Sequence, residues 1–500
     1  MSTRLPFEQT YIDTLRSQPV SQQGHLIEGL RVPASNDALM EVVSPIDGQV
    51  FTHIANGTVN DMDQAIASAR VAFDDGRWSK MSLAARKAVL FRLADLIDAE
   101  SLALSVLGVR DNGTEISMAF KAESGSAAGT FRYYAEAVDK CYGQIAPTAE
   151  SVLGLVHHEP VGVVGAIVPW NFPLMIGAWK LGPALASGNC VVLKPAETAS
   201  LALLRLGELA LEAGLPPGVL NIVTGEGKVV GRAMGLSPLV DVLVFTGSGA
   251  TGRRLLQYAA QSNLKRVYLE LGGKSPNIVF ADAPDLDHAA KVSAAAIFRN
   301  SGQVCIAGSR LLVEASIHDD FVDALCRVAE MYNVGDPLEL TTDIGAVNNE
   351  HQLALNLNSV RDAEAQGAHT QIGGTPLHVA SGGYYMSPTV ITGVKSHHAL
   401  ARNEIFGPVL AVTAFNSEQE AVTLANDSEL GLAAGVWTSE LSRAHRMVRN
   451  INAGVVHVNT YGGADNTVPL GGIGQSGNGH DKSMHALGKY TNLKTAWMQL

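Results

Sequence analysis

The chain has 500 residues, of which 46% are hydrophobic and 17% are charged, and its formal net charge is −12. This length predicts more than one domain with a buried core. The acidic balance argues against nucleic acid as a partner, because phosphates require a basic surface. The longest apolar run, 161–168, contains glycine and stops at Pro169. It is far shorter than the roughly 20 residues that span a bilayer, so we expect no membrane insertion.

The cysteines show no paired spacing, and none forms a CxxC motif. They are Cys141, Cys190, Cys305 and Cys326. This spacing predicts neither a disulfide framework nor a metal site. The first ten residues are polar and are not followed by the apolar run of a secretory signal. We therefore expect a cytoplasmic protein without a bound metal.

The N-terminal third mixes polar loops with segments of helical periodicity. The pattern predicts a strand over 38–43, helices over 59–73 and 82–107, and a strand over 151–157 that lies outside the main core.

From residue 162 onward, short apolar runs alternate with helical patterns, which indicates a parallel α/β sheet. The expected strands are 163–168, 190–193, 219–223 and 242–245, and the expected helices are 174–187, 200–213, 229–234 and 251–261. A second α/β series runs through 277–280, 311–313, 321–331, 409–415 and 455–459. The last segment, 493–500, predicts a lone apolar strand that pairs with another element or another subunit.

Two residues suggest covalent chemistry. An alanine-rich, helix-like run leads through Gly302 and Gln303 to Cys305, and Glu270 ends an apolar strand-like run before a glycine pair. A thiol that can ionise and a carboxylate on a glycine turn are the groups needed for covalent attack followed by hydrolysis. Either residue alone is weak support, because a lone cysteine among small residues is more often a buried small hydrophobe.

Lys194 and Glu197 directly follow the expected strand 190–193. Ligands of a doubly wound sheet lie beyond the carboxyl ends of its strands, where these side chains can bond ribose hydroxyls. A carboxylate there repels a 2′-phosphate and so favours NAD over NADP. A solvated loop between strand and helix is the alternative that this tetrapeptide alone leaves open.

Two glycine clusters each follow an apolar strand and open a helix. They are Gly225, Gly227 and Gly231, and then Gly247, Gly249 and Gly252 around Ser248. Free backbone N–H groups at a helix N-terminus suit a pyrophosphate, although the GxGxxG spacing of the second cluster is weak support by itself.

Six motifs occur together and in order along essentially the whole chain. They are PWNFP at 169–173, KPAE at 194–197, FTGS at 245–248, LELGGK at 269–274, GQVC at 302–305 and EIFGP at 404–408. As a set they resemble the aldehyde dehydrogenase superfamily.

The resemblance implies an α/β fold with a Rossmann-like cofactor domain, an α/β catalytic domain and a small β oligomerisation element. The implied bounds are 1–143 and 161–272 for the NAD-binding domain, 273–483 for the catalytic domain, and 144–160 with 484–500 for the oligomerisation element. A homotetramer or homodimer is implied as well.

The resemblance also implies roles for single residues. Cys305 looks like the nucleophile, Glu270 like the general base and Asn171 like the donor to the oxyanion. The implied cofactor contacts are Ile167, Trp170, Lys194, Glu197, Gly227, Gly231, Phe245, Gly247, Ser248, Leu271, Glu404 and Phe406. The implied substrate pocket consists of Phe172, Met175, Trp179, Val304, Ile306, Ala464, Asp465 and Leu470. The expected cofactor is NAD, and the expected reaction oxidises an aldehyde to a carboxylic acid through a thioester.

The segment 459–472 resembles the loop that borders the substrate tunnel in this family. Ala464 and Leu470 stand where many members carry aromatic rings, so a longer or bulkier substrate is expected, unless the loop has simply repacked. The tail 474–483 looks most like the γ-glutamyl-γ-aminobutyraldehyde dehydrogenase branch, which acts in polyamine breakdown, although His480 stands where relatives usually carry Arg. Asp465 at the tunnel mouth could attract an amino group, and a solvated aspartate is the simpler interpretation.

The preferred hypothesis is therefore oxidation of an ω-amino or γ-glutamylamino aldehyde. The alternatives within the fold are betaine-type, semialdehyde or broad aliphatic aldehyde substrates. A thiol esterase and a non-catalytic member of the family are more remote. Glu197 and Glu404 argue against the esterase, and the presence of Cys305 and Glu270 argues against the non-catalytic member.

Overall fold

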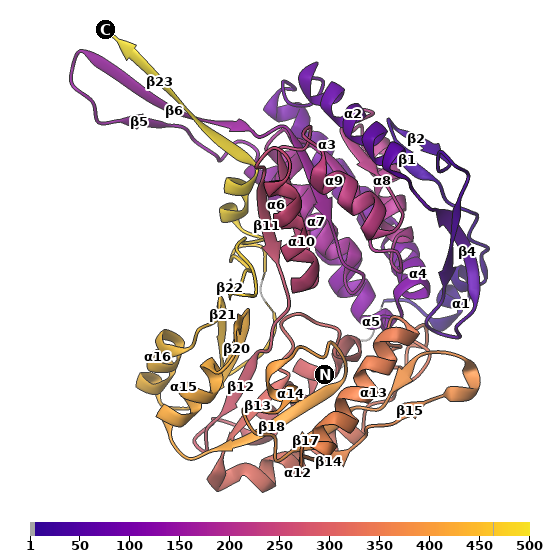
Figure 1. Cartoon of the computed structure of the whole chain (residues 1–500), viewed down its shortest axis with the longest axis vertical. Helices are drawn as coiled ribbons and strands as arrows, with labels where there is room; N and C mark the ends of the chain where they lie inside the picture. Colours follow the sequence, from indigo (N-terminus) through magenta and orange to yellow (C-terminus); the bar gives the residue numbers. More distant parts are fainter. Residues whose placement is uncertain (1–5, 464) are drawn as a thin grey trace.

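The structure is a computed structural model that describes residues 6–463 and 465–500. Its elements gather into two α/β bodies, from which a thin arm projects (Figure 1). The N-terminal half of the chain, drawn in indigo to magenta, builds the first body, and the orange and yellow segments build the second. The C-terminal end leaves the second body and runs into the arm beside the first.

The first body is built on a sheet with the strand order β11-β10-β7-β8-β9-β1-β2. The strands from β7 to β11 pair in parallel, whereas β1 pairs antiparallel with β9 and β2. Helices cover these parallel strands, which explains why they appear in the sequence as continuous apolar runs. The strands are β1 His25–Ile27, β2 Leu30–Val32, β7 Val163–Ile167, β8 Cys190–Lys194, β9 Leu220–Ile222, β10 Val242–Thr246 and β11 Arg266–Glu270.

The helices of the first body differ from the sequence prediction at two places. The predicted helix 82–107 is two helices, because the backbone at Glu100 (φ −101°, ψ 12°) leaves the helical region. The predicted helix 229–234 begins earlier, as a π-helical turn over Gly227–Gly231. The elements are α2 Val59–Asp74, α3 Leu83–Ala99, α4 Ser101–Asn112, α5 Ile116–Met118, the π-helical η1 Ala119–Gly125, α6 Ser126–Ala137, α7 Pro173–Ala186, α8 Leu201–Glu212, η2 Gly227–Gly231, α9 Arg232–Leu236 and α10 Gly249–Ala260. At the N-terminal side, α1 Gln9–Ser17 precedes a hairpin of β3 Leu39–Val43 and β4 Val50–Ala55.

The second body repeats this architecture with the strand order β14-β17-β18-β13-β12-β20-β21. The strands pair in parallel except for β14, which lies antiparallel at the edge. The strands are β12 Pro276–Val279, β13 Arg310–Glu314, β14 His369–Ile372, β17 Thr389–Thr392, β18 Val409–Phe415, β20 Ala433–Trp437 and β21 Val455–Val458. The helices are α11 Leu286–Phe298, α12 His318–Glu330, α13 Glu350–Ala365, α14 Ala399–Arg402, α15 Glu418–Asn426 and α16 Leu441–Asn450.

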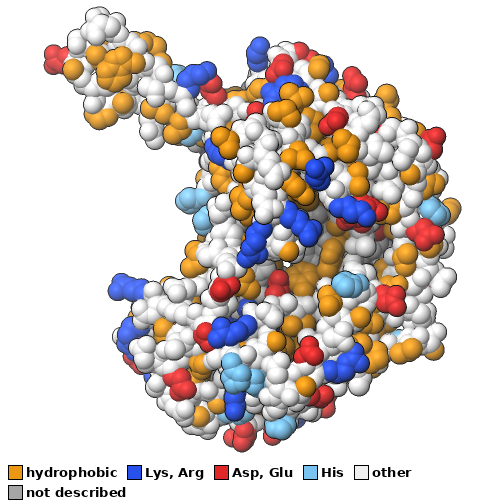
Figure 2. All heavy atoms as spheres, in the orientation of Figure 1, with side chains coloured by type: hydrophobic (Ala, Val, Ile, Leu, Met, Phe, Trp, Pro, Cys, Tyr) orange, Lys and Arg blue, Asp and Glu red, His pale blue; other side chains and the backbone are white. Residues whose placement is uncertain are grey.

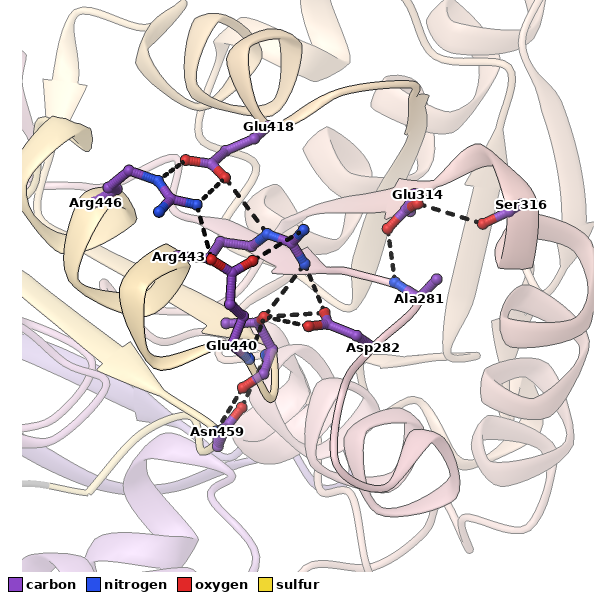
Figure 3. A network of polar contacts seen from close by, with 10 residues as sticks. Ala281, Asp282, Glu314, Ser316, Glu418, Glu440, Arg443, Arg446 and Asn459 are labelled. Atoms are coloured by element: carbon purple, nitrogen blue, oxygen red, sulfur yellow. Dashed lines mark hydrogen bonds and ion pairs between the residues drawn. The ribbon is translucent and has the colours of Figure 1, made fainter.

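A polar network closes the carboxyl edge of the second sheet (Figure 3). Arg443 from α16 bonds Asp282, which follows β12, at 2.8 Å, and Arg446 bonds Glu418 of α15 at 2.7 Å. Asn459, just after β21, accepts from the backbone N–H of Thr438 and donates to its carbonyl, each at 3.0 Å. The loop 459–472 is therefore fixed where it begins.

The arm is a three-stranded sheet with the order β23-β6-β5. β23 (Thr491–Gln499) pairs antiparallel with β6 (Val152–Pro160) along its whole length, and β5 (Gln144–Ala146) forms the other edge. The terminal strand predicted from the sequence therefore pairs within its own chain. Apolar side chains are nevertheless exposed on the arm (Figure 2), with Leu493 69% and Trp497 67% accessible.

The two seven-stranded sheets and the sheet of the arm use separate stretches of sequence. The domain boundaries 1–143 with 161–272, 273–483, and 144–160 with 484–500 stay a prediction. Of the helices in the described part of the chain, none is both long and apolar enough to cross a membrane.

Candidate functional site

A cavity of about 290 Å³ lies at the carboxyl edge of the first sheet, where this face of the molecule is hollowed between the two bodies (Figure 2). The chain reverses its direction across the sheet here, because β8 and β9 lie on one side of β7 while β10 and β11 lie on the other. Such a switch point is where open α/β sheets bind ligands. The lining residues are Pro169, Trp170, Asn171, Ile176, Thr246, Gly247, Ser248, Glu270, Leu271, Gly272, Cys305, Gln352, Leu355, Glu404, Ile405 and Phe406.

Cys305 reaches this cavity through an unusual backbone turn. Helix α11 ends at Phe298, and Asn300 (φ 49°), Ser301 (φ 52°) and Gly302 (φ 72°) then adopt left-handed conformations one after another. Left-handed conformations at Asn300 and Ser301 cost roughly 1–3 kcal/mol each, so the surroundings must hold them. Gly302 is required, because a Cβ there would lie 2.1 Å from the Gly407 carbonyl oxygen.

The thiol of Cys305 is protonated at neutral pH in this environment. Burial raises its pKa to about 12, and the carboxylates of Glu404 and Glu270 raise it further in the same direction. A nucleophilic role therefore requires a group that removes the proton, or a bound ligand that changes the local field.

Glu270 is the last residue of β11 and lines the same cavity, with 7% of its surface exposed. Its Oε1 has no hydrogen-bond partner among the described residues. Burial and the nearby Asp481 hold the pKa of Glu270 well above its usual range, while Lys180 and Lys489 act in the opposite direction. A buried carboxyl with a raised pKa suits proton transfer near neutral pH.

Asn171 lies beside the cysteine loop. Its Nδ2 donates to the Gln303 carbonyl at 2.8 Å, and its own carbonyl accepts from Asn300 Nδ2 at 3.2 Å. A side-chain amide carries two N–H bonds, so one remains available in the cavity for an oxygen of a ligand.

Lys194 and Glu197 meet beyond β8. Their side chains form an ion pair at 3.0 Å, and the Gly227 N–H donates to Glu197 Oε1 at 2.6 Å. A Cβ on Gly227 would lie 3.6 Å from Glu197 Oε1, and one on Gly231 would lie 3.8 Å from Ile167 Cδ1. Either Cβ would make only an ordinary van der Waals contact. The polar feature here is the Lys194–Glu197 pair with the Gly227 N–H, at the carboxyl end of β8, where a doubly wound sheet binds a ribose.

Ser248 is the N-cap of α10, and its Oγ accepts from the Thr251 N–H at 3.3 Å. Gly247 packs against Phe245, since a Cβ there would meet the ring at 2.5 Å. The N-terminal end of this helix faces the cavity together with Leu271. This arrangement suits a phosphate group.

Glu404 and Phe406 form the opposite wall of the cavity. The Gly273 N–H donates to Glu404 Oε1 at 3.1 Å, and a Cβ on Gly272 would lie 1.9 Å from Glu404 Oε2, so any side chain there would displace the Glu404 carboxylate. Burial raises the pKa of Glu404 to about 7. Phe406 is itself left-handed (φ 59°) and packs edge-on against Trp170, with the ring centroids 5.2 Å apart.

Gln352 of α13 is a residue that sequence reasoning missed. Its Nε2 donates to the Ile405 carbonyl at 2.8 Å and so holds the segment that carries Glu404 and Phe406. A polar residue on an exposed-looking helix gives no local signal of such a contact.

A second cavity of about 250 Å³ lies on the other side of the cysteine loop, because Val304 and Ile306 line it while Cys305 lines the first. Of the predicted pocket residues, Phe172, Met175, Trp179, Val304, Ile306 and Leu470 line this second cavity. Asp465 does not line it. Its carboxylate turns back instead to accept from the Thr467 N–H at 2.8 Å. Ala464 lies outside the described residues.

Several lining residues of the second cavity were not predicted. Tyr461 could have been predicted from the sequence, because it belongs to the loop 459–472. Its hydroxyl donates to the Ile306 carbonyl at 2.8 Å. Met118 and Ala122 come from the region of the π-helix η1, which has no simple sequence pattern. The unpredicted residues are Met118, Ala122, Ala295, Ala296, Arg299, Val455, His457, Tyr461, Gly462, Gly463 and Lys482. Within the described residues, His, Cys, Asp and Glu side chains form no group of three or more that could hold a metal ion.

Comparison with known proteins gives the same family as the six sequence motifs. The model of the aldehyde dehydrogenase family matches residues 32–496. The NADP/NAD-dependent aldehyde dehydrogenase PuuC of Escherichia coli (strain K12) is 48% identical over 475 residues, which cover 95% of each chain. A crystal structure of a γ-glutamyl-γ-aminobutyraldehyde dehydrogenase from Burkholderia cenocepacia J2315 is 46% identical with a TM-score of 0.97, covering 99% of this chain and 100% of that one. An indole-3-acetaldehyde dehydrogenase complexed with NAD+ is 45% identical with the same TM-score and coverage. The chain belongs to the aldehyde dehydrogenase family.

Proposed function

We propose that this aldehyde dehydrogenase oxidises a γ-glutamylamino aldehyde to the carboxylic acid with NAD, using Cys305 as the nucleophile. The observation that supports this most is the position of Cys305. Its thiol lines the cavity that also contains Asn171 and Glu270, and its two neighbours line a largely apolar cavity on the other side.

The reaction begins when Glu270 takes the proton of the Cys305 thiol and passes it to solvent, and the sulfur adds to the aldehyde carbonyl carbon. The carbonyl oxygen becomes an oxyanion that accepts from Asn171 Nδ2 and from the Cys305 backbone N–H. One such donor contributes about 3 kcal/mol to transition-state stabilisation. When NAD is bound by Lys194, Glu197, Ser248 and Glu404, it supplies the hydride acceptor.

The thioester that remains on Cys305 is hydrolysed. Glu270 takes a proton from water, the water oxygen attacks the acyl carbon, and the carbon–sulfur bond breaks to release the acid and the thiolate. The raised pKa of Glu270 makes its carboxylate a stronger base than an exposed glutamate. Because hydrolysis needs such a base, its presence favours the free acid over an acyl transfer to coenzyme A.

The substrate is inferred from the charges of the second cavity. Its charged lining residues are Arg299 and Lys482, and no carboxylate among the described residues lines it. Aromatic and aliphatic side chains, including Phe172, Trp179 and Leu470, form the rest. Two cations disfavour a bare ω-ammonium and favour a carboxylate at the far end of a long, partly apolar aldehyde.

A γ-glutamylamino aldehyde has this shape and charge. Its methylene and amide portion fits the apolar length of the cavity, and its α-carboxylate can meet Lys482. Burial lowers the pKa of Lys482, while the nearby Asp465 acts in the opposite direction, so a carboxylate brought close to Lys482 favours its charged form in the same way. The solved relative of γ-glutamyl-γ-aminobutyraldehyde dehydrogenase type supports the same choice.

The test is a comparison of kcat/KM for γ-glutamylaminobutanal, 4-aminobutanal, succinic semialdehyde, betaine aldehyde, hexanal and indole-3-acetaldehyde, with NADH formation as the readout. We expect γ-glutamylaminobutanal to be preferred over 4-aminobutanal by at least about tenfold, the value of one lost charge contact. Lys482→Met should remove most of that preference and leave hexanal unaffected. Cys305→Ala should abolish turnover of every aldehyde. Equal kcat/KM values across the panel would refute the substrate, and turnover by Cys305→Ala would refute the mechanism.

We also propose that the arm joins copies of the chain into a homodimer or homotetramer, since β23 and β5 leave strand edges and apolar side chains exposed. A cytoplasmic location agrees with four free cysteines.

A further inference from the structure

The turn between α4 and α5 reaches from the first body to the cysteine loop of the second. Residues Asn112, Thr114 and Glu115 in and beside this turn are each no more than 2% exposed. None of them was expected at the site from the sequence. Their side chains contact the segments on both sides of the proposed oxyanion position.

On one side, the turn holds the left-handed Asn300. Glu115 Oε1 accepts from the Asn300 backbone N–H at 3.1 Å, and Thr114 Oγ1 donates to Asn300 Oδ1 at 2.9 Å. These bonds satisfy the backbone and the side chain of the residue at which the chain leaves the helical region after α11. Arg299 also acts on the Glu115 carboxylate, because its charge partly offsets the effect of burial on the pKa of Glu115.

On the other side, the same turn holds the segment that carries Asn171. Asn112 Nδ2 donates to the Trp170 carbonyl at 3.3 Å, and Asn300 Nδ2 donates to the Asn171 carbonyl at 3.2 Å. Gln303 links Asn300 and Asn171 a second time. Its side-chain Nε2 donates to the Asn300 carbonyl at 3.1 Å, and its backbone carbonyl accepts from Asn171 Nδ2 at 2.8 Å. Asn300 is therefore the junction between the nucleophile loop and the amide of Asn171.

We propose that Glu115 is a positioning residue that fixes the left-handed conformation of Asn300 and thereby sets the Cys305 thiol and the Asn171 amide relative to each other. This inference rests on the proposed roles of Cys305 and Asn171 but not on the identity of the aldehyde. A left-handed non-glycine residue reverts to more favourable backbone angles when its partners are lost, and displacement of a reacting group by about 1 Å costs up to about 100-fold in rate.

The two informative variants are Glu115→Ala and Glu115→Gln. Alanine removes the acceptor of the Asn300 N–H, whereas glutamine keeps an Oε1 at the same place. Burial raises the pKa of Glu115 to about 7, so an uncharged amide resembles the carboxylic acid that is present below neutral pH. Asp61→Ala is the matched control, because Asp61 is also a buried carboxylate that accepts from a backbone N–H (Ser35, 3.0 Å) but lies at the start of α2.

The first readout is alkylation of Cys305 by iodoacetamide in the enzyme without added aldehyde or NAD, followed by peptide mass spectrometry. The exposed Cys141 in the same sample is the internal reference. We expect Glu115→Ala to change the Cys305 rate by at least about tenfold and Glu115→Gln and Asp61→Ala to change it by less than about threefold, with Cys141 unchanged in all. A Cys305 rate within twofold of wild type in Glu115→Ala would overturn the proposal.

The second readout is single-turnover hydride transfer in the Glu115→Ala and Asn171→Ala variants and in the double variant. If Glu115 acts through the position of Asn171, the rate of hydride transfer in the double variant should lie within about twofold of the rate in Asn171→Ala. If the double variant instead loses the product of the two single-variant rate factors, Glu115 does not act through the position of Asn171. Should Glu115→Ala fail to fold, Thr114→Val replaces it, because it removes the other side-chain bond to Asn300. We expect the same changes in the Cys305 alkylation rate and in hydride transfer, but smaller ones. Because alkylation needs no aldehyde, a wrong substrate assignment leaves this test intact, whereas turnover by Cys305→Ala would remove its premise.

Discussion

Burial decides the chemistry of single residues in this cleft. Glu270 is buried and Cys305 is partly exposed to the cavity, and desolvation raises the pKa of each, so the resting site holds a neutral thiol beside a carboxyl group of enhanced basicity. Glu270 is the residue in the better position to control the second half of the reaction, because the thioester can leave Cys305 only after a water molecule is deprotonated.

Glu270→Gln should therefore slow hydrolysis of the acyl enzyme more than hydride transfer. General-base catalysis contributes about 10²–10⁴-fold, so steady-state turnover should fall within that range. Stopped-flow absorbance at the start of the reaction should show a burst of NADH close to one per active site. Hydride transfer that slows in parallel, with no burst, would remove Glu270 from the role of base.

Glu197 is expected to determine the choice of cofactor. Its carboxylate bonds Lys194 and the Gly227 N–H, so a 2′-phosphate placed there would be repelled by the carboxylate while the Lys194 ammonium is already paired with Glu197. Glu197→Gln should lower KM for NADP by about tenfold or more while changing KM for NAD by less. Initial rates with both cofactors measure this ratio. An unchanged ratio would mean that Glu197 has only a structural role in its loop.

At the scale of elements, the π-helix η1 and helix α7 form one wall of the second cavity. Glu123 in η1 is 4% exposed, and its carboxylate accepts from the Met175 N–H at 2.8 Å in the first turn of α7. An N-terminal carboxylate normally stabilises a helix. Here burial dominates and raises the pKa of Glu123 to about 8, against the usual value of 4.5.

Because this pKa is raised in the folded state, the carboxyl group destabilises the fold as pH increases. Below about pH 4.5 the group is protonated in both states and has no effect, and between pH 4.5 and 8 the unfolded state gains by ionising. The cumulative loss is at most about 4–5 kcal/mol. Glu123→Gln should thus raise Tm relative to wild type by an amount that grows from pH 5 to pH 8. A Tm difference that does not change with pH would contradict the shift.

The regular elements that carry the site could be predicted from sequence. The buried strands β7, β8 and β10 appear as short apolar runs that end at Pro169, Lys194 and the glycines around Ser248. The left-handed turn at Asn300 and Ser301 could not be predicted, because neither residue is glycine and the turn depends on Glu115, which is distant in sequence.

The second cavity was less predictable for the same reason. Arg299 and Lys482 come from different parts of the second body and its C-terminal extension, and only the tertiary fold brings their charges to one cavity. Asp465 was expected there from the neighbouring loop, but its hydrogen bonds with Thr467 turn it toward solvent. The sequence thus predicted the residues that share the first cavity with Cys305 better than the charged residues that line the second.

At the scale of the whole molecule, the arm is the part least explained by the chain alone. The nine-residue pairing of β23 with β6 leaves Leu493 and Trp497 largely exposed. Exposed apolar side chains do not stabilise a monomer. A surface of this kind is expected to be covered by another copy of the chain, and closed symmetric assemblies are the rule for such contacts.

Trp497→Glu should therefore weaken assembly without disturbing the core. Placing a charge in an apolar contact costs several kcal/mol, enough to shift a dimer or tetramer toward smaller species at micromolar concentration. Sedimentation velocity of wild type and variant measures this shift, and the circular dichroism spectrum checks that the fold is kept. An identical sedimentation coefficient for both proteins would place the contact elsewhere.

The strand that builds the arm follows closely on the segment behind Glu270. Asp481 bonds both Lys180 and Lys489 at 2.5 Å, and Ser476 Oγ donates to the Gly272 carbonyl at 2.7 Å, so the final part of the chain completes the floor of the cleft. Glu270 is therefore buried only when the segment 476–489 has packed behind it. Local opening of this segment exposes the carboxylate to water and returns its pKa toward that of an ordinary glutamate, so the basicity of Glu270 depends on how firmly the C-terminal segment is docked.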